Sequence, residues 1–89
     1  MTWIVEWEDQ ARRELRKLDK KLQQNILRYL REKIAIKNDP GRFGKPLSYD
    51  KHNLWRYRVQ DARIICRIFE DEVLVLVVRV GHRKNVYNF

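Results

Sequence analysis

Arginines recur in three segments of the C-terminal half, and their spacing suits them to hold a phosphate group. Arg56 and Arg58 lie two residues apart in the segment Leu-Trp-Arg-Tyr-Arg-Val. Arg63 stands near the start of the next apolar segment, and Arg83 follows the last one. Residues two apart on a strand share a face, and side chains opposite one another on neighbouring strands lie about 5 Å apart. These four arginines are therefore expected to converge on one sheet face, where planar, permanently protonated guanidinium groups donate paired hydrogen bonds to phosphate.

The same arginines have a second interpretation, in which they belong to a solvated outer face. Acidic residues that would pair with them stand nearby in the sequence, namely Asp61, Glu70 and Asp71. The C-terminal Tyr87 also has two interpretations. Its ring either stacks on an exposed base or folds over the edge of the sheet.

The remaining reactive side chains do not form a catalytic or metal-binding set. Cys66 has apolar neighbours and no disulfide partner, which indicates a buried small hydrophobic residue rather than a nucleophile. His52 lies in a polar loop. His82, beside Arg83, could serve as an acid or base, but a lone histidine beside arginine is more often a phosphate contact or simply exposed. One thiol and two histidines make a poor zinc set. We therefore expect no metal and no other cofactor.

The charge balance points to a polyanionic partner. The 89 residues include 20 Lys and Arg against 12 Asp and Glu, which gives a net charge of +8. Such an excess attracts nucleic acid first, an anionic membrane surface second and an acidic protein third. No run of about 18 apolar residues is present to span a membrane, and the start, Met-Thr-Trp-Ile-Val-Glu, does not look like a secretion signal. These features predict one compact domain, residues 1–89, in the cytoplasm.

The pattern of apolar residues predicts an α+β fold. Residues 2–7 alternate like a strand, and two apolar series with helical spacing follow, the second ending before Pro40. From residue 54 the period changes to two, in runs over 54–59, 62–69 and 73–80. The breaks between these runs are too short for anything but antiparallel hairpins. We therefore predict an N-terminal strand and an antiparallel helix hairpin packed on a twisted, four-stranded, mainly antiparallel sheet.

The order of these elements and three stretches of sequence resemble the RelE branch of the RelE/ParE superfamily of type II toxins. The stretches begin at Leu54 (Leu-Trp-Arg-Tyr-Arg-Val), Asp61 (Asp-Ala-Arg-Ile-Ile) and Val80 (Val-Gly-His-Arg-Lys-Asn-Val-Tyr). The likeness covers nearly the whole chain. It implies a RelE-like fold and a metal-independent, ribosome-dependent endoribonuclease, an mRNA interferase that inhibits translation. In such an enzyme a ribose 2′-hydroxyl attacks the adjacent phosphate of mRNA in the decoding site.

The resemblance also implies roles for particular residues. It places catalytic groups at Arg58, Arg63, Arg83 and Tyr87, and RNA contacts at Lys45, Arg56, His82 and Lys84. The chain departs from the family pattern in two places. Arginines stand on the first hairpin strand where the family often has lysines, and arginine is a poor general base. Gln60 stands where the usual turn has glycine, which predicts a less permissive hairpin.

The resemblance implies partners and leaves two other functions open. The expected partners are the ribosome with mRNA, a RelB-like antitoxin whose acidic segment wraps the toxin, and operator DNA reached through that antitoxin; no membrane is expected. The first alternative is a ParE-like inhibitor of a topoisomerase such as gyrase, which acts by protein contact without RNA cleavage. The second is a nucleic-acid-binding module or an inactivated toxin, whose basic patch binds without turnover.

Overall fold

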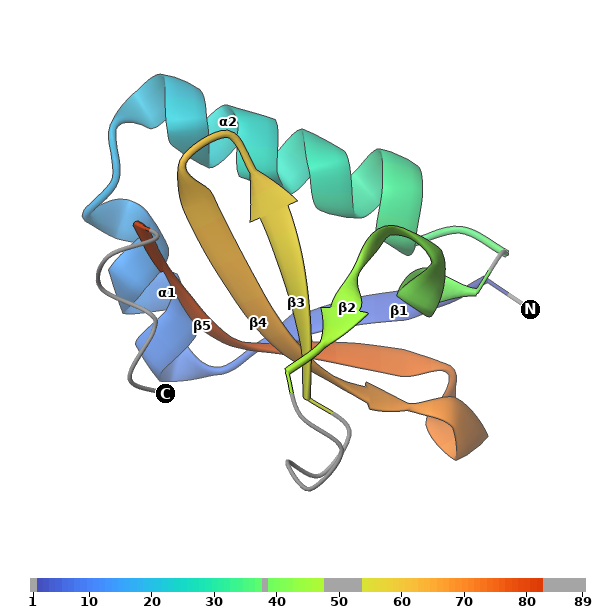
Figure 1. Ribbon diagram of the computed structural model, residues 1–89. Helices are drawn as coiled ribbons and strands as arrows, with labels where there is room; N and C mark the ends of the chain where they lie inside the picture. The colour runs from blue at the N-terminus through green and yellow to red at the C-terminus, as the bar shows by residue number, and fades with distance from the viewer. Residues whose placement is uncertain (1, 38, 48–53, 83–89) are drawn as a thin grey trace.

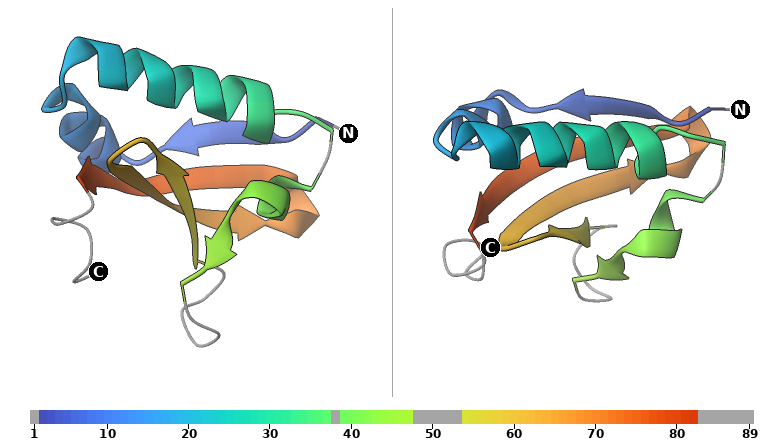
Figure 2. Two further views of the ribbon diagram at one scale, coloured as in Figure 1. Left: turned by 45° about the horizontal axis from the view of Figure 1, so that its top comes forward. Right: turned by 90° about the horizontal axis from the view of Figure 1, so that it is seen from above.

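The computed structural model describes residues 2–37, 39–47 and 54–82, which form a sheet with two helices packed against it (Figure 1). The helices are α1 (Asp9–Arg16) and α2 (Lys20–Tyr29), and α2 lies along one face of the sheet (Figure 2). The strands are β1 (Ile4–Trp7), β2 (Lys45–Pro46), β3 (Leu54–Val59), β4 (Ala62–Phe69) and β5 (Leu74–His82). The predicted α+β class is confirmed.

The sheet has five strands in the order β1-β5-β4-β3-β2, rather than the predicted four. β1 is parallel to β5, and the other neighbouring pairs are antiparallel. The additional strand is β2, whose two residues pair with Arg56 and Trp55. Sequence reasoning misses it because proline cannot donate a ladder hydrogen bond. An edge strand tolerates Pro46, since one side of its backbone needs no partner strand.

One face of the sheet and both helices enclose the main hydrophobic core. The sheet contributes fully buried side chains such as Tyr57 and Cys66. The helices contribute Ala11 from α1 and Ile26 from α2, which are also fully buried. The opposite face, which we call the open face, is covered by neither described helix and carries a smaller apolar cluster of Leu54, Ile65 and Val78.

Local features of the chain set the boundaries of the second helix. Asp19 caps α2, because its carboxylate accepts a hydrogen bond from the Leu22 backbone N–H at 3.2 Å. After α2 the chain continues in a π-helical turn, Leu30–Ile34, which the Ala35 N–H closes onto the Leu30 carbonyl at 2.7 Å. The helical segment therefore ends before Pro40, as the sequence predicts.

Tyr57 joins the core to the turn that precedes β2. Its side chain is fully buried, and its hydroxyl donates a hydrogen bond to the Pro40 carbonyl oxygen at 2.5 Å. Burial raises the pKa of the Tyr57 hydroxyl, so that it stays protonated and remains a donor. This bond holds the 3-10 turn Pro40–Phe43 against β3, directly before the start of β2.

We expect Tyr57→Phe to lower the free energy of unfolding by about 1–2 kcal/mol, because it leaves the Pro40 carbonyl without its buried donor. Urea unfolding followed by tryptophan fluorescence measures this change. Tyr29→Phe is the matched control. The Tyr29 ring lies 6.1 Å from that of Tyr57, but its hydroxyl has no hydrogen-bond partner among the described residues. Equal losses in the two variants would show that the Pro40 bond contributes nothing.

Candidate functional site

Basic side chains from three strands lie together on the open face. In the sheet register Arg58 lies opposite Arg63, and Arg63 lies opposite Gly81. Residues paired in this way project from the same side of a sheet. A second row of paired residues lies two positions along the strands from Arg58 and Arg63. It crosses four strands and consists of Lys45, Arg56, Ile65 and Arg79. We call Lys45, Arg56, Arg58 and Arg63 the basic cluster; the structure brings these four predicted site residues together.

Arg63 has the most unusual environment in the basic cluster. Its exposed fraction is only 7%, although guanidinium groups are rarely buried without partners. Its Nε and Nη1 atoms are buried and have no hydrogen-bond partner among the residues that the structure describes. Gly81, directly opposite, has no side chain to occupy the space beside it. Buried donors of this kind destabilise a fold unless an anion binds to them.

The other members of the basic cluster are more accessible. Lys45 and Arg58 are exposed, and Arg56 is half-buried. The Arg58 Nε donates to the Gln60 carbonyl oxygen at 3.4 Å, which turns the side chain toward the hairpin end. Gln60 has a φ of 54°, so the strain predicted for a residue other than glycine is present at this turn.

No acidic side chain among the described residues neutralises the basic cluster. Within residues 2–37, 39–47 and 54–82, none of its members forms an ion pair with a carboxylate. The interpretation in which Asp61, Glu70 and Asp71 pair with these arginines is therefore wrong for the described part of the chain. Four acids instead line a hollow at the far end of β4, together with Trp55, Ile68 and Phe69: Asp39, Glu70, Asp71 and Glu72. Arg63 and Phe69 are six strand positions apart, which is about 20 Å.

The remaining predicted site residues are not brought into the basic cluster. Arg83, Lys84 and Tyr87 lie outside the described residues. His82 is exposed and lies opposite Ala62, a core residue, so the register places it on the other side of the sheet from Arg63. Its proposed contact with RNA stays a prediction.

Strand periodicity alone does not find Arg79 and Glu14, which lie next to the basic cluster. A β-bulge in β5 pairs Cys66 with Val77 but Ile65 with Arg79, so that Val78 is an extra residue. Arg79 consequently joins the open face and forms an ion pair with Glu14 of α1, with 2.9 Å between Nε and Oε2. The signal that could have indicated the bulge is Arg79 itself, because strict alternation from the buried Val75 and Val77 would place this charged residue in the core.

Cys66 is a core residue, as the sequence predicts. It is fully buried, and burial raises the pKa of its thiol, so that it is protonated and unreactive near neutral pH. In the described ranges, no three His, Cys, Asp or Glu side chains lie close enough together to hold a metal ion. Neither described helix has the length and apolar character of a membrane span.

The fold places the chain among the small RelE-like toxins. The chain belongs to the ParE toxin family of type II toxin–antitoxin systems, because the family model described as "ParE toxin of type II toxin-antitoxin system, parDE" matches residues 5–87. It is 28% identical to Toxin RelG of Mycobacterium tuberculosis over 87 residues, which cover 98% of each chain.

Solved structures of related toxins share the fold. The toxin–antitoxin complex RelBE2 of Mycobacterium tuberculosis matches with a TM-score of 0.83 and 26% identity, covering 96% of this chain and 95% of the other. A mutant of the Escherichia coli toxin RelE in the free state matches with a TM-score of 0.77 and 18% identity, covering 97% and 88%. The RelB–RelE complex of Methanococcus jannaschii matches with a TM-score of 0.73 and 20% identity, covering 94% and 96%.

Proposed function

We propose that this type II toxin is a metal-independent endoribonuclease that cleaves mRNA on the ribosome and so inhibits translation. The observation that carries the proposal is the state of Arg63. It is a nearly buried cation, and two of its donors have no partner among the described residues. It faces Gly81 across the sheet, and Arg58 lies on its other side. A toxin that acts only through protein contacts has no need of such an anion site.

The proposed reaction is an intramolecular displacement at phosphorus. The ribose 2′-oxygen forms a bond to the adjacent phosphorus, the bond from phosphorus to the 5′-oxygen breaks, and a 2′,3′-cyclic phosphate results. The 2′-hydroxyl loses its proton and the departing 5′-oxygen gains one. Negative charge builds on the non-bridging oxygens in the transition state. Donors fixed beforehand at that position stabilise this charge, which is often the largest single contribution to catalysis.

The basic cluster supplies this electrostatic part of the reaction. Arg63 is proposed to donate from Nε and Nη1 to the phosphate oxygens, because a guanidinium edge matches two oxygens at once. Arg58 is proposed to contact the same phosphate, and Lys45 and Arg56 the neighbouring RNA backbone. From the family resemblance, Arg83 is assigned to the leaving oxygen and Tyr87 to base stacking or proton handling.

Proton removal is the part of the reaction for which the basic cluster is poorly suited. Arginine keeps its proton at any physiological pH, so it does not act as a general base. We therefore propose that the ribosome aligns the mRNA for in-line attack, which makes the displacement a well-oriented intramolecular step. We therefore expect weak cleavage of free RNA, because the ribosome is not there to align it.

The proposed partners are the ribosome with mRNA and a cognate antitoxin. RelBE2 of Mycobacterium tuberculosis and the RelB–RelE protein of Methanococcus jannaschii are toxin–antitoxin complexes. By analogy we propose a RelB-like antitoxin for this chain, with an acidic segment that complements the net charge of +8. Contact with operator DNA takes place through the antitoxin, and the toxin acts in the cytoplasm, where ribosomes are found.

One observation favours a second function. The matching family model is described as the ParE toxin of the parDE system, so inhibition of gyrase by protein contact is the competing proposal. The two functions differ in whether Arg63 and Arg58 are required and in which macromolecule is damaged.

Mapping mRNA 5′ ends after induction of the toxin alone separates these functions. We expect new 5′ ends within translated frames, and cleavage in vitro at least about 100-fold faster on programmed ribosomes than on the same RNA free in solution. Plasmid supercoiling is measured in the same cells. Intact mRNA with altered supercoiling would reject the nuclease and favour gyrase inhibition. Intact mRNA, normal supercoiling and normal growth would indicate a binding module or an inactivated toxin.

A further inference from the structure

None of the described strands borders the outer side of β5 at the end that approaches Arg63. β1 pairs with β5 only from Ile4 opposite Leu74 to Trp7 opposite Val77. Beyond that point the chain leaves β1 through Glu8 and enters α1, whereas β5 continues to His82. β4 pairs with the other side of β5 throughout. The outer edge of residues 78–82 therefore needs another partner for its backbone.

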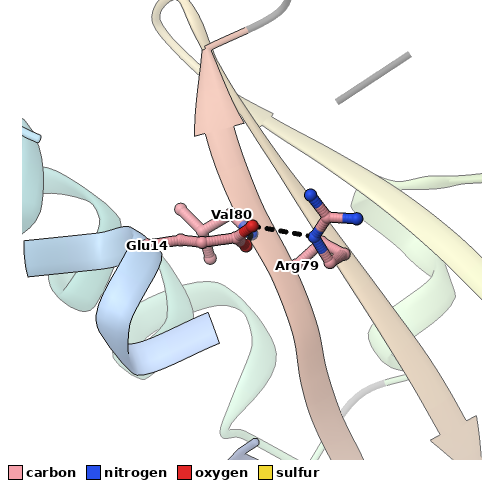
Figure 3. Close-up of polar contacts among 3 residues, drawn as sticks. All are labelled: Glu14, Arg79 and Val80. Carbon is pink, nitrogen blue, oxygen red and sulfur yellow. Dashed lines mark hydrogen bonds and ion pairs between the residues drawn. The ribbon is translucent and has the colours of Figure 1, made fainter. Parts of the chain in front are cut away.

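Glu14 supplies that partner from α1. Its Oε1 accepts a hydrogen bond from the Val80 backbone N–H at 2.8 Å, and its Oε2 accepts one from the Arg79 Nε at 2.9 Å (Figure 3). The Glu14 side chain is 19% exposed, so the carboxylate is largely protected from water. The Glu14 side chain thus accepts the backbone hydrogen bond that a neighbouring strand would accept, and it also binds the Arg79 side chain.

The residues that Glu14 holds adjoin the basic cluster directly. Val80 lies between Arg79, which belongs to the row of Arg56, and Gly81, which lies opposite Arg63. The bulge at Val78 loosens the pairing just before this segment. A change in position of Val80 would therefore move Gly81 relative to the unpartnered donors of Arg63.

We propose that Glu14 is a positioning residue for phosphate binding by Arg63, acting through its hydrogen bond to the Val80 N–H. This inference rests on the proposed RNA cleavage and adds a residue that does not touch the RNA. This hydrogen bond needs both the length of the Glu14 side chain and an acceptor oxygen at its end. Aspartate is one methylene shorter and does not reach β5 from the same helix position. Glutamine keeps one acceptor oxygen for the Val80 N–H but loses the charge and the acceptor for the Arg79 Nε, because its amide nitrogen only donates.

The test uses the full-length toxin with Glu14→Ala, Glu14→Asp and Glu14→Gln. Hydrogen exchange at the Val80 amide reports on the hydrogen bond without any RNA. We expect roughly 10- to 100-fold faster exchange in the alanine and aspartate variants and near-wild-type exchange in the glutamine variant. For cleavage of mRNA on programmed ribosomes, we expect kcat to fall at least about tenfold in the first two variants, with KM changed less than about twofold. The Glu14→Gln variant should keep kcat within about threefold of wild type.

Three results would overturn the proposal. Unchanged Val80 exchange in Glu14→Asp would show that the hydrogen bond does not depend on this side chain. Faster exchange with unchanged kcat would make Glu14 a structural cap only, and rescue by aspartate but not by glutamine would make its role one of charge. The aspartate variant keeps the test valid where alanine prevents folding. Glu32→Ala, at an exposed glutamate of the π-helical turn, controls for loss of a helical carboxylate and should behave as wild type.

The cleavage assay also separates the failure of this inference from the failure of the proposed function. If wild-type toxin does not cut ribosome-bound mRNA, the nuclease proposal is wrong and the role of Glu14 in it is wrong as well. If wild type and Glu14→Asp cut equally well, the nuclease proposal stands and only the positioning role of Glu14 is rejected.

Discussion

Arg63→Met is expected to reduce ribosome-dependent mRNA cleavage by at least about 100-fold, a typical cost of removing one donor from a charge-stabilising site. The same substitution is expected to stabilise the fold. Arg63 is 7% exposed, and its buried Nε and Nη1 have no hydrogen-bond partner among the described residues. Removing these groups from water without a partner lowers the free energy of unfolding. Methionine fills a similar space without polar atoms, and we expect the free energy of unfolding to rise by about 1–3 kcal/mol.

Cleavage is measured on programmed ribosomes, and stability by urea unfolding in the absence of RNA. Arg67→Met is the matched control, because Arg67 also lies on β4 but stands four positions from Arg63, opposite Leu54 and Leu76. It should change cleavage less than about threefold. Arg63→Lys keeps the charge but loses the paired donors, and it should recover only a small part of the activity.

Lower stability of Arg63→Met would mean that the guanidinium stabilises the fold, and Arg63 would then be a structural residue. Full cleavage by this variant would exclude Arg63 from the reaction. The combination that we expect, higher stability with lost activity, is typical of a side chain held in an unfavourable environment for the sake of function.

Gly44→Ala is expected to destabilise the protein by about 3 kcal/mol, which lowers Tm by roughly 15 °C for a chain of this size. A Cβ atom at position 44 would lie 2.7 Å from Tyr57 Cε1 and 2.8 Å from the Arg56 carbonyl oxygen. Neither neighbour has room to move, because Tyr57 is fully buried and hydrogen-bonded to Pro40 and the Arg56 oxygen is part of the backbone. These close contacts would displace the start of β2 and so disturb the pairing of Lys45 with Arg56.

Gly41→Ala is the control for this substitution, because it makes the same chemical change in the same turn. Its Cβ would lie 3.2 Å from the nearest atom, the outer ring of the half-buried Trp55 side chain, which can shift by a few tenths of an ångström. We expect a loss below about 1 kcal/mol. Thermal unfolding by circular dichroism compares the two variants. Similar Tm values would show that the contact with Tyr57 relaxes at little cost.

Local patterns in the sequence predict most of the fold because they reflect short-range physics. The change of period from 3.6 to two identifies the helices and the three antiparallel strands that follow them. Alternation also places Arg56 and Arg58 on one face and Tyr57 on the other, as observed. The short strand β2 is missed, because a two-residue edge containing Pro46 has no periodicity to detect.

The basic cluster illustrates the limit of such reasoning. A strand without a bulge, continued from the pairing of Cys66 with Val77, would place Val80 opposite Arg63 and Arg79 opposite the buried Ile64. In the structure the extra residue Val78 shifts the register, so that Gly81 faces Arg63. The charge of Arg79 indicates an irregularity, but no local preference specifies where the extra residue falls, because that depends on how β5 packs against β4 and α1 together.

The sequence by itself therefore determined that this protein is a basic α+β chain with two arginine-bearing strands, because composition and alternation are properties of neighbouring residues. Folding adds that Arg63 is nearly buried without a partner among the described residues, and that Glu14, 66 positions before Val80, binds the outer edge of β5. Burial and long-range hydrogen bonds depend on which segments meet after folding, and neighbouring residues in the sequence do not specify that.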